Sequence, residues 1–255
     1  MRYLDRNGFA GLLRSLAEAG YEVIGPTVRD GAIVLEPIEG AHDLPAGVSE
    51  EQGPGVYRLG ARDDDRVFAW AHGPDAAKRF LFPPRELLTT IRRNGGVHAE
   101  PAPEEPKPFA FVGLRSCDLH AIAVQDKVFL DLDPAYRRRR ERAVFIGVNC
   151  EVPGGTCFCV SMDTGPRCTV GFDLALTELD DGFLVEEGTS RGTELLAAVE
   201  SREATAPEVD EVERIADRAR AAMGRVLDTS DLPHLLLPRR GRRREPLGRR
   251  GDPDA

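Results

Sequence analysis

Two apolar runs, Phe109-Ala110-Phe111-Val112-Gly113-Leu114 and Val144-Phe145-Ile146-Gly147-Val148, decide the fold of this chain. Continuous apolar runs of this length are typical of strands that are buried on both faces. Between them, residues 118–129 carry apolar side chains at helical spacing, and the charged run 137–142 favours a second helix. A strand, helices and a second strand predict a βαβ unit. We therefore expect an α/β fold, with α+β as the alternative, built on a mixed sheet with flanking helices.

The segment before this unit, residues 1–100, predicts a small N-terminal portion made of a helix and an antiparallel sheet. The helix is expected at residues 7–20, where Phe9, Leu12, Leu13 and Leu16 recur at helical spacing and Gly20 provides a stop. The expected strands are 21–26 and 31–35, then a hairpin of 56–59 with 67–71 around the turn at 63–65, while 40–56 is expected to be a loop.

Proline and charge mark the other boundaries. Residues 101–108, with the sequence PAPEEPKP, are the expected linker to a cysteine-bearing domain at 109–237. Within that domain, residues 171–187 predict two strands joined by a turn, and residues 206–226 predict a charged helix. The last segment, 238–255, contains seven arginines and almost no apolar residues, so we expect it to be disordered.

The composition excludes several classes of function. The formal net charge of -9 argues against nucleic acid as the main partner, because phosphate binding needs a basic face. No apolar run is long enough to span a bilayer, and the first residues lack the apolar core of a signal peptide. We therefore expect a cytoplasmic protein, in which clustered cysteines are more often metal ligands or redox thiols than disulfides.

Cysteine is the residue type that points to chemistry. Cys150, Cys157, Cys159 and Cys168 fall in one short stretch, and the fifth, Cys117, follows the first buried strand. Four thiolates are the ligand set of structural zinc and of Fe–S clusters. Loops that follow adjacent parallel strands are neighbours, so the two groups of cysteines can converge. The alternative is that they are ordinary buried cysteines.

Two polar residues beside Cys117 allow alternative interpretations. Asp118 and His120 are able to serve as a ligand, a proton relay or a hydrogen-bond partner of a ligand. We favour a helix-capping role for Asp118 and a surface or packing role for His120.

Several motifs in one order resemble a known family. They are Phe80-Leu81-Phe82-Pro83-Pro84-Arg85-Glu86, Arg115-Ser116-Cys117-Asp118-Leu119-His120-Ala121-Ile122, Gln125-Asp126-Lys127-Val128-Phe129, Asp133-Pro134-Ala135-Tyr136, Gly147-Val148-Asn149-Cys150, Thr156-Cys157-Phe158-Cys159-Val160-Ser161-Met162, Gly165-Pro166 and Gly171-Phe172-Asp173-Leu174-Ala175-Leu176-Thr177-Glu178-Leu179. Together they resemble the iron–sulfur (beta) subunit of soluble sulfhydrogenases and the corresponding iron–sulfur subunit of anaerobic sulfite reductase, over about residues 80–190.

The resemblance implies an electron-transfer function. Such subunits carry electrons between a flavin subunit that handles NAD(P) and the catalytic subunit of a hydrogenase or sulfite reductase. It implies a non-catalytic component of an oxidoreductase complex, with no catalytic residues of its own. Cys117, Cys150, Cys157 and Cys159 lie inside the matched motifs and are the expected ligands of one 4Fe-4S cluster, whereas Cys168 lies outside the recognised pattern.

The chain departs from the family's pattern after residue 237. The family continues into a ferredoxin-like domain with two further 4Fe-4S clusters, whereas here the arginine-rich segment follows. We expect a chain truncated before that domain, with a shifted reading frame as the source of residues 238–255. One cluster at most is then expected in this chain.

Two other functions remain open at this level. The first is a non-redox scaffold that docks partner subunits, with cysteines that bind zinc or no metal. The second is a thiol redox sensor that uses Cys157 and Cys159.

Overall fold

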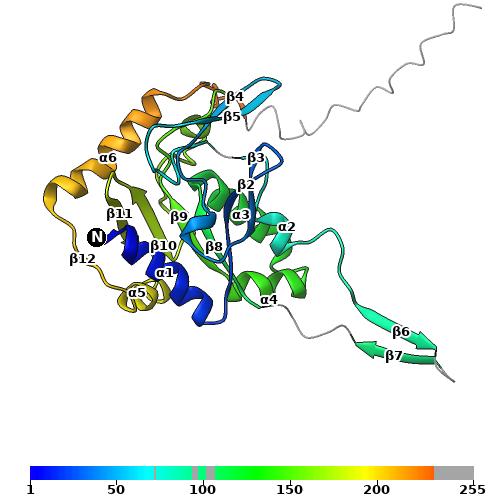
Figure 1. Cartoon of the computed structure of the whole chain (residues 1–255). Helices are drawn as coiled ribbons and strands as arrows, with labels where there is room; N and C mark the ends of the chain where they lie inside the picture. The colour runs from blue at the N-terminus through cyan, green and yellow to red at the C-terminus, as the bar shows by residue number, and fades with distance from the viewer. Residues whose placement is uncertain (72, 94–96, 102–106, 233–255) are drawn as a thin grey trace, which may run out of the picture.

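The computed structural model describes residues 1–71, 73–93, 97–101 and 107–232. Its centre is an eight-stranded mixed sheet with the strand order β12-β1-β11-β10-β9-β8-β2-β3 (Figure 1). The strands are β1 (Arg2–Asp5), β2 (Glu22–Arg29), β3 (Ala32–Pro37), β8 (Phe109–Leu114), β9 (Val144–Val148), β10 (Leu174–Glu178), β11 (Gly182–Glu187) and β12 (Arg202–Glu203). The helices are α1 (Arg6–Glu18), α2 (Lys78–Leu81), α3 (Ser116–Phe129), α4 (Pro134–Arg142), α5 (Ser190–Ala197) and α6 (Ala206–Ala221), with short 3₁₀ turns at Ala41–Asp43 and Cys159–Met162.

The middle of the sheet is parallel and its edges are antiparallel. Strands β2, β8, β9 and β10 run parallel, whereas β3, β11, β1 and β12 are added in antiparallel pairs. Every residue of β8, β9 and β10 is buried, as the apolar runs predict for strands covered on both faces. The expected α/β fold with a mixed sheet is confirmed.

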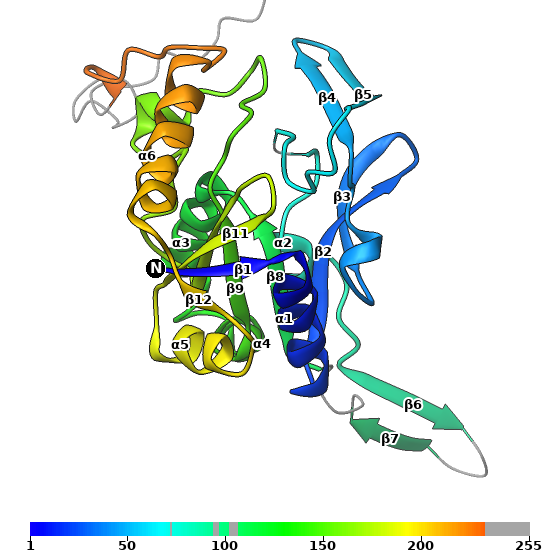
Figure 2. The same cartoon turned by 60° about the vertical axis from the view of Figure 1, so that its left-hand side comes forward.

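Helices cover the two faces of the sheet (Figure 2). On one face, Phe9, Leu12 and Leu16 of α1 and Leu196 of α5 pack with Val112 and other inward-facing strand residues. On the other face, α2, α3 and α4 contribute Leu81, Leu119, Ile122 and Tyr136 to a second apolar cluster around Phe111 and Phe145. Consecutive residues of a strand point to opposite faces, so β8 supplies both clusters.

Residues 48–71 differ from the expectation. The structure pairs β4 (Val48–Gly53) with β5 (Val56–Ala61), so part of the expected loop is a strand. Residues 67–71 form no strand and are buried instead. The predicted hairpin of 56–59 with 67–71 is wrong, because the short turn after Gly53, with Gly55 at φ +74°, closes the pairing earlier in the chain.

The other predicted elements agree with the structure apart from their ends. The helix predicted at 118–129 begins two residues earlier, at Ser116, and the helix predicted to end at 226 ends at Ala221. Strands β1, β6 (Thr89–Arg93), β7 (Val97–Pro101) and β12 and helices α2 and α5 were not anticipated from the sequence. Strands β1, β2 and β3 lie in the same sheet as the strands after residue 109, not in a sheet of their own.

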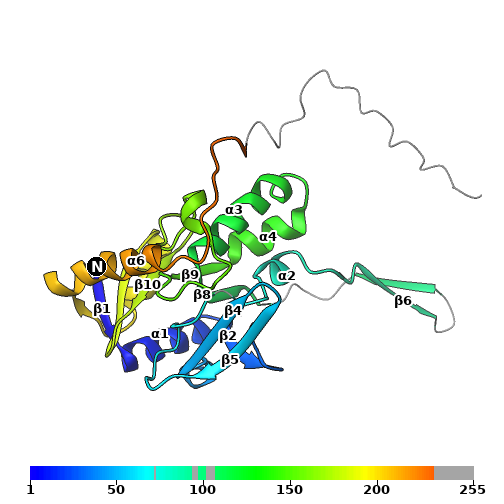
Figure 3. The ribbon, with the colours of Figure 1, turned by 90° about the horizontal axis from the view of Figure 1, so that it is seen from above.

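Another hairpin, β6 (Thr89–Arg93) with β7 (Val97–Pro101), projects from the body beyond α2 (Figure 3). Most of the expected linker 101–108, and all of the expected disordered segment 238–255, lie outside the described residues. No helix in the described part of the chain has the length and apolar character needed to cross a membrane.

Candidate metal centre

Two loops that follow neighbouring parallel strands carry the cysteines. β8 and β9 are paired in parallel, with Phe111 opposite Phe145 and, after a register shift between Val112 and Leu114, Leu114 opposite Gly147. β8 ends at Leu114 and α3 begins at Ser116, so Cys117 lies in the first turn of the helix that follows β8. The segment between β9 and β10, residues 149–173, carries the other four cysteines and is named the cysteine loop here. Both loops lie at the carboxyl edge of the sheet, where α/β proteins place their sites.

Four of the five cysteines line a single cavity of about 20 Å³. They are Cys117, Cys150, Cys157 and Cys159, the four residues that the sequence singles out. Arg115, Ser116, Pro153, Gly165, Pro166 and Met223 complete the lining. None of the five cysteines forms a disulfide.

Cys168 and His120 lie elsewhere. Cys168 is 2% exposed and belongs to the apolar cluster around Phe111, on the α3 side of the sheet. The Nδ1 of His120 lies 2.9 Å from the carbonyl oxygen of Ser116, so the ring is tied to its own helix. The carboxylate of Asp118 accepts a hydrogen bond from the backbone N–H of Arg115 at 2.8 Å. Asp118 therefore has a capping role, although it sits at the third position of the helix and Arg115 is the N-cap residue.

The cysteine loop is held from two sides. The N–H of Gly155 donates to the carbonyl of Gln52 in β4 at 2.9 Å. From the other side, the N–H of Arg225 donates to the carbonyl of Cys157 at 3.0 Å. The N–H of Leu227 donates to Ser161 Oγ at 2.9 Å, so the chain after α6 crosses over the loop. These contacts fix the cysteines on a scaffold drawn from three parts of the sequence.

Burial keeps the thiols protonated in the absence of a metal. It raises the pKa of Cys159 to about 11 and is also the main cause of the raised pKa values of Cys117, Cys150 and Cys157. The positive charge of Arg115 acts in the opposite direction and lowers the pKa of Cys150. Ligation of a metal requires thiolates, so a cation beside these sulfurs favours the binding state.

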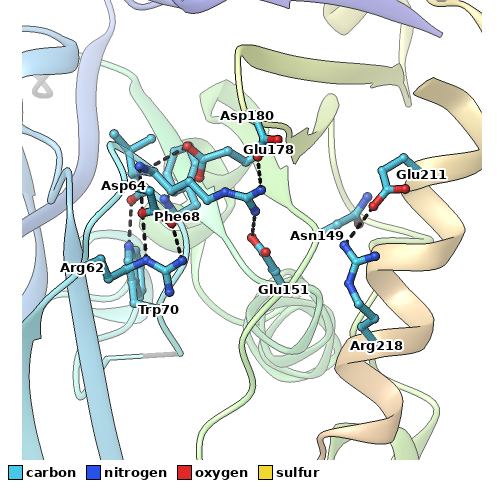
Figure 4. Close-up of polar contacts among 12 residues, drawn as sticks. Arg62, Asp64, Phe68, Trp70, Asn149, Glu151, Glu178, Asp180, Glu211 and Arg218 are labelled. Carbon is cyan, nitrogen blue, oxygen red and sulfur yellow. Dashed lines mark hydrogen bonds and ion pairs between the residues drawn. The ribbon is translucent and has the colours of Figure 1, made fainter. Parts of the chain in front are cut away.

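Arg115 is the most unusual residue of the site. It is 2% exposed, and its guanidinium donates to the carbonyls of Phe68 at 2.6 Å and Trp70 at 2.7 Å. It also lies over the Trp70 ring at 4.6 Å. The segment 67–71 that provides these carbonyls is positioned in turn by Glu178, whose carboxylate accepts from the backbone N–H groups of Val67 and Phe68 (Figure 4). Glu178 thus binds backbone N–H groups of the segment 67–71, and Arg115 binds its backbone carbonyl groups.

The residues fit a soft metal group in donor type and charge. Four thiols share one cavity, and two polar atoms beside it, Arg115 Nε and Ser116 Oγ, are buried without a hydrogen-bond partner. The cavity volume accommodates about one water molecule, so a larger group would require the lining residues to rearrange. Within the described ranges, no three Cys, His, Asp or Glu side chains are gathered closely enough to hold a single metal ion. The site is therefore not a preformed tetrahedral zinc site, in which four sulfurs lie about 2.3 Å from one ion.

Sequence reasoning missed Arg115, Ser116 and Met223 as lining residues. Arg115 and Ser116 directly precede Cys117, but an arginine next to a cysteine is usually a surface residue. Met223 follows α6, more than fifty residues after the last of the four cysteines, and no local pattern connects it to them.

Comparisons with known proteins add one relative. No family model matches the chain, and no solved structure matches it. Among curated proteins, it is similar to the sulfhydrogenase 2 subunit beta of Pyrococcus furiosus, with 37% identity over 121 residues. The match covers 47% of this chain and 34% of the relative, so the chain matches about a third of the relative's length. Over that stretch, the chain is related to a hydrogenase beta subunit.

Proposed function

We propose that this chain is a cytoplasmic electron-transfer component of a hydrogenase or sulfite reductase complex. In this proposal, Cys117, Cys150, Cys157 and Cys159 hold one 4Fe-4S cluster, which supplies one-electron transfer chemistry when bound. The observation that carries the proposal is the convergence of these four thiols, from two loops, on one cavity. The relation to a sulfhydrogenase beta subunit supports the redox assignment.

The protein residues have separate roles in this proposal. The four cysteines provide ligands, and the sheet edge fixes the relative position of their two loops. Cys168 provides apolar packing within the core. The partners would be a flavin subunit that binds NAD(P) and a catalytic subunit, with this chain between them.

One-electron exchange tests the function. The chain, reconstituted with iron and sulfide under anaerobic conditions, is reduced with dithionite, separated from excess reductant and mixed with cytochrome c in a stopped-flow instrument. We expect about one electron per chain to reach cytochrome c, as one cluster implies. Cys150→Ala should deliver none, and Cys168→Ala should match the wild type. Equal delivery by the wild type and Cys150→Ala would overturn the proposal.

A scaffold function is the second candidate, favoured by the projecting hairpin of β6 and β7. Leu88 is 75% exposed, Ile91 66% and Val97 69%. An isolated two-stranded hairpin is marginally stable in water, so exposed apolar residues on it favour contact with another protein. A scaffold with zinc or no metal would transfer no electrons in the same assay.

A further inference from the structure

Arg115 places a guanidinium in the interior of the protein, beside the cysteine cavity. None of the ion pairs among the described residues includes its guanidinium. Its partners are carbonyl oxygens of Phe68 and Trp70, with that of Asn149 at a longer 3.5 Å. The nearby carboxylate of Asp118 accepts a hydrogen bond from the backbone N–H of Arg115. Burial of a charge without a counter-ion is costly, so an anion is expected to complete the site.

The unsatisfied donors of this region belong to residues that line the cysteine cavity. Arg115 Nε and Ser116 Oγ are both buried and lack a hydrogen-bond partner, and both residues line the cavity with the four thiols. Ser116 is also the first residue of α3, whose N-terminus carries a partial positive charge. The charge, the two donors and the helix end therefore meet the thiols at one place.

The position of Arg115 is determined by contacts distant in the sequence. Its guanidinium is clamped by the carbonyls of the buried segment 67–71 and by the face of the Trp70 ring. A flexible surface arginine could move away from the cavity, whereas this one is fixed on both sides. A fixed, buried charge interacts strongly with other charges at the cavity, because little solvent is present to screen it.

We propose that Arg115 is the counter-charge of the cysteine site and raises the reduction potential of the cluster that the four cysteines hold. The inference rests on the function proposed above. On reduction the site gains one electron from the donor and no bond is formed or broken, so its negative charge increases by one. A fixed positive charge stabilises the more negative state more strongly, and cluster potentials depend on such charges and on hydrogen bonds to sulfur.

A matched pair of substitutions isolates the charge. Arg115→Lys and Arg115→Gln both lose the two-pronged contact with Phe68 and Trp70, but only Arg115→Gln loses the positive charge. Each protein is reconstituted with iron and sulfide, and its potential is measured by anaerobic redox titration with mediators. We expect the equilibrium constant for one-electron reduction to be about tenfold lower for Arg115→Gln than for Arg115→Lys, which is about 59 mV. Equal potentials would overturn the inference.

A second pair serves if neither Arg115 variant retains iron. Ser116→Asp places a carboxylate beside Arg115 without removing its contacts, and Ser116→Asn is the neutral control of the same size. Aspartate is favourable in the first turn of a helix, so folding is expected to be kept. A lower potential or a lower iron content for Ser116→Asp than for Ser116→Asn supports the inference, and equal values for the pair contradict it. A wild-type chain that takes up no cluster would instead contradict the proposed function itself.

Discussion

The carboxylate of Glu178 accepts a hydrogen bond from the backbone N–H of Phe68 at 2.7 Å, although the two residues are 110 positions apart. Its other oxygen accepts from the N–H of Val67 at 2.8 Å and from Arg6 at 2.9 Å. The carbonyl of the same Phe68 accepts from Arg115 at the cysteine cavity. Phe68 therefore connects the end of β10 to the candidate metal centre.

Substitution of Glu178 should loosen this connection. In Glu178→Gln, an amide NH₂ replaces one acceptor and faces a backbone N–H, so a buried donor is left unpaired. We expect a loss of about 2 kcal/mol in the free energy of unfolding, measured with urea. Asp180→Asn is the control, because Asp180 is 86% exposed and its ion pair with Arg66 is expected to contribute less than about 1 kcal/mol. Equal losses for the two variants would show that the Glu178 contacts add little.

Substitution of Cys168 distinguishes a packing role of a cysteine from a role as a metal ligand. Its side chain is buried in an apolar cluster and does not line the cavity, so Cys168→Ala should retain the iron content of the wild type. It should lower the free energy of unfolding by roughly 1–2 kcal/mol, because a small cavity remains in the core. Cys157→Ala should lose the iron with little effect on the stability of the apoprotein. Iron analysis and urea unfolding of the two variants check both expectations, and loss of iron from Cys168→Ala would mean that the ligand set is different.

Gly155 should control the position of the cysteine loop. A Cβ atom at this position would clash with the carbonyl oxygen of Gln52, which also accepts the N–H of Gly155. Backbone cannot yield as a flexible side chain does, so Gly155→Ala should displace the loop and reduce the iron content by at least about half. Gly53→Ala is the control. Gly53 follows Gln52 in β4, a Cβ atom there meets no atom within 4 Å, and the variant should retain its iron. Full iron content in Gly155→Ala would indicate that the loop tolerates the shift.

Glu208 should contribute stability that is lost in acid. A hydrogen bond from Arg202 is the main cause that lowers the pKa of Glu208 from 4.5 to about 2. A carboxyl group whose pKa is lower in the folded state stabilises the fold above its unfolded pKa. This contribution disappears as the pH falls from about 4.5 to about 2. Glu208→Gln should therefore lower the thermal midpoint at pH 7 and much less at pH 2, whereas exposed Glu194→Gln should lower it at neither pH. A decrease at pH 2 as large as that at pH 7 would show that the stabilisation does not come from the ionised carboxylate of Glu208.

The sequence predicted the elements whose pattern is local. The apolar runs at 109–114 and 144–148 identified the central strands, because strands buried on both faces have no polar alternation. Placement of cysteines after these two strands was sufficient to expect that four of them meet, and the same four line the cavity. The ligation of a cluster by these residues stays a prediction.

The elements that were missed either lack an apolar pattern or depend on distant partners. Strand β4 is polar, with the sequence VSEEQG, and its pairing is set by the turn that follows it. The apolar run 67–71 resembles a strand, but its backbone groups bond to Glu178 and Arg115 instead of a neighbouring strand. The spacing of apolar residues within the segment gives no indication that Glu178 and Arg115 are its partners. The role of Arg115 was hidden for the same reason.

Metal and sulfide analysis after anaerobic reconstitution tests the central claim most directly. The account predicts about four iron atoms and four sulfides per chain, a visible absorbance that bleaches on reduction and an electron paramagnetic resonance signal in the reduced state. Zinc alone at about one ion per chain, or a colourless protein without iron and sulfide, would contradict it.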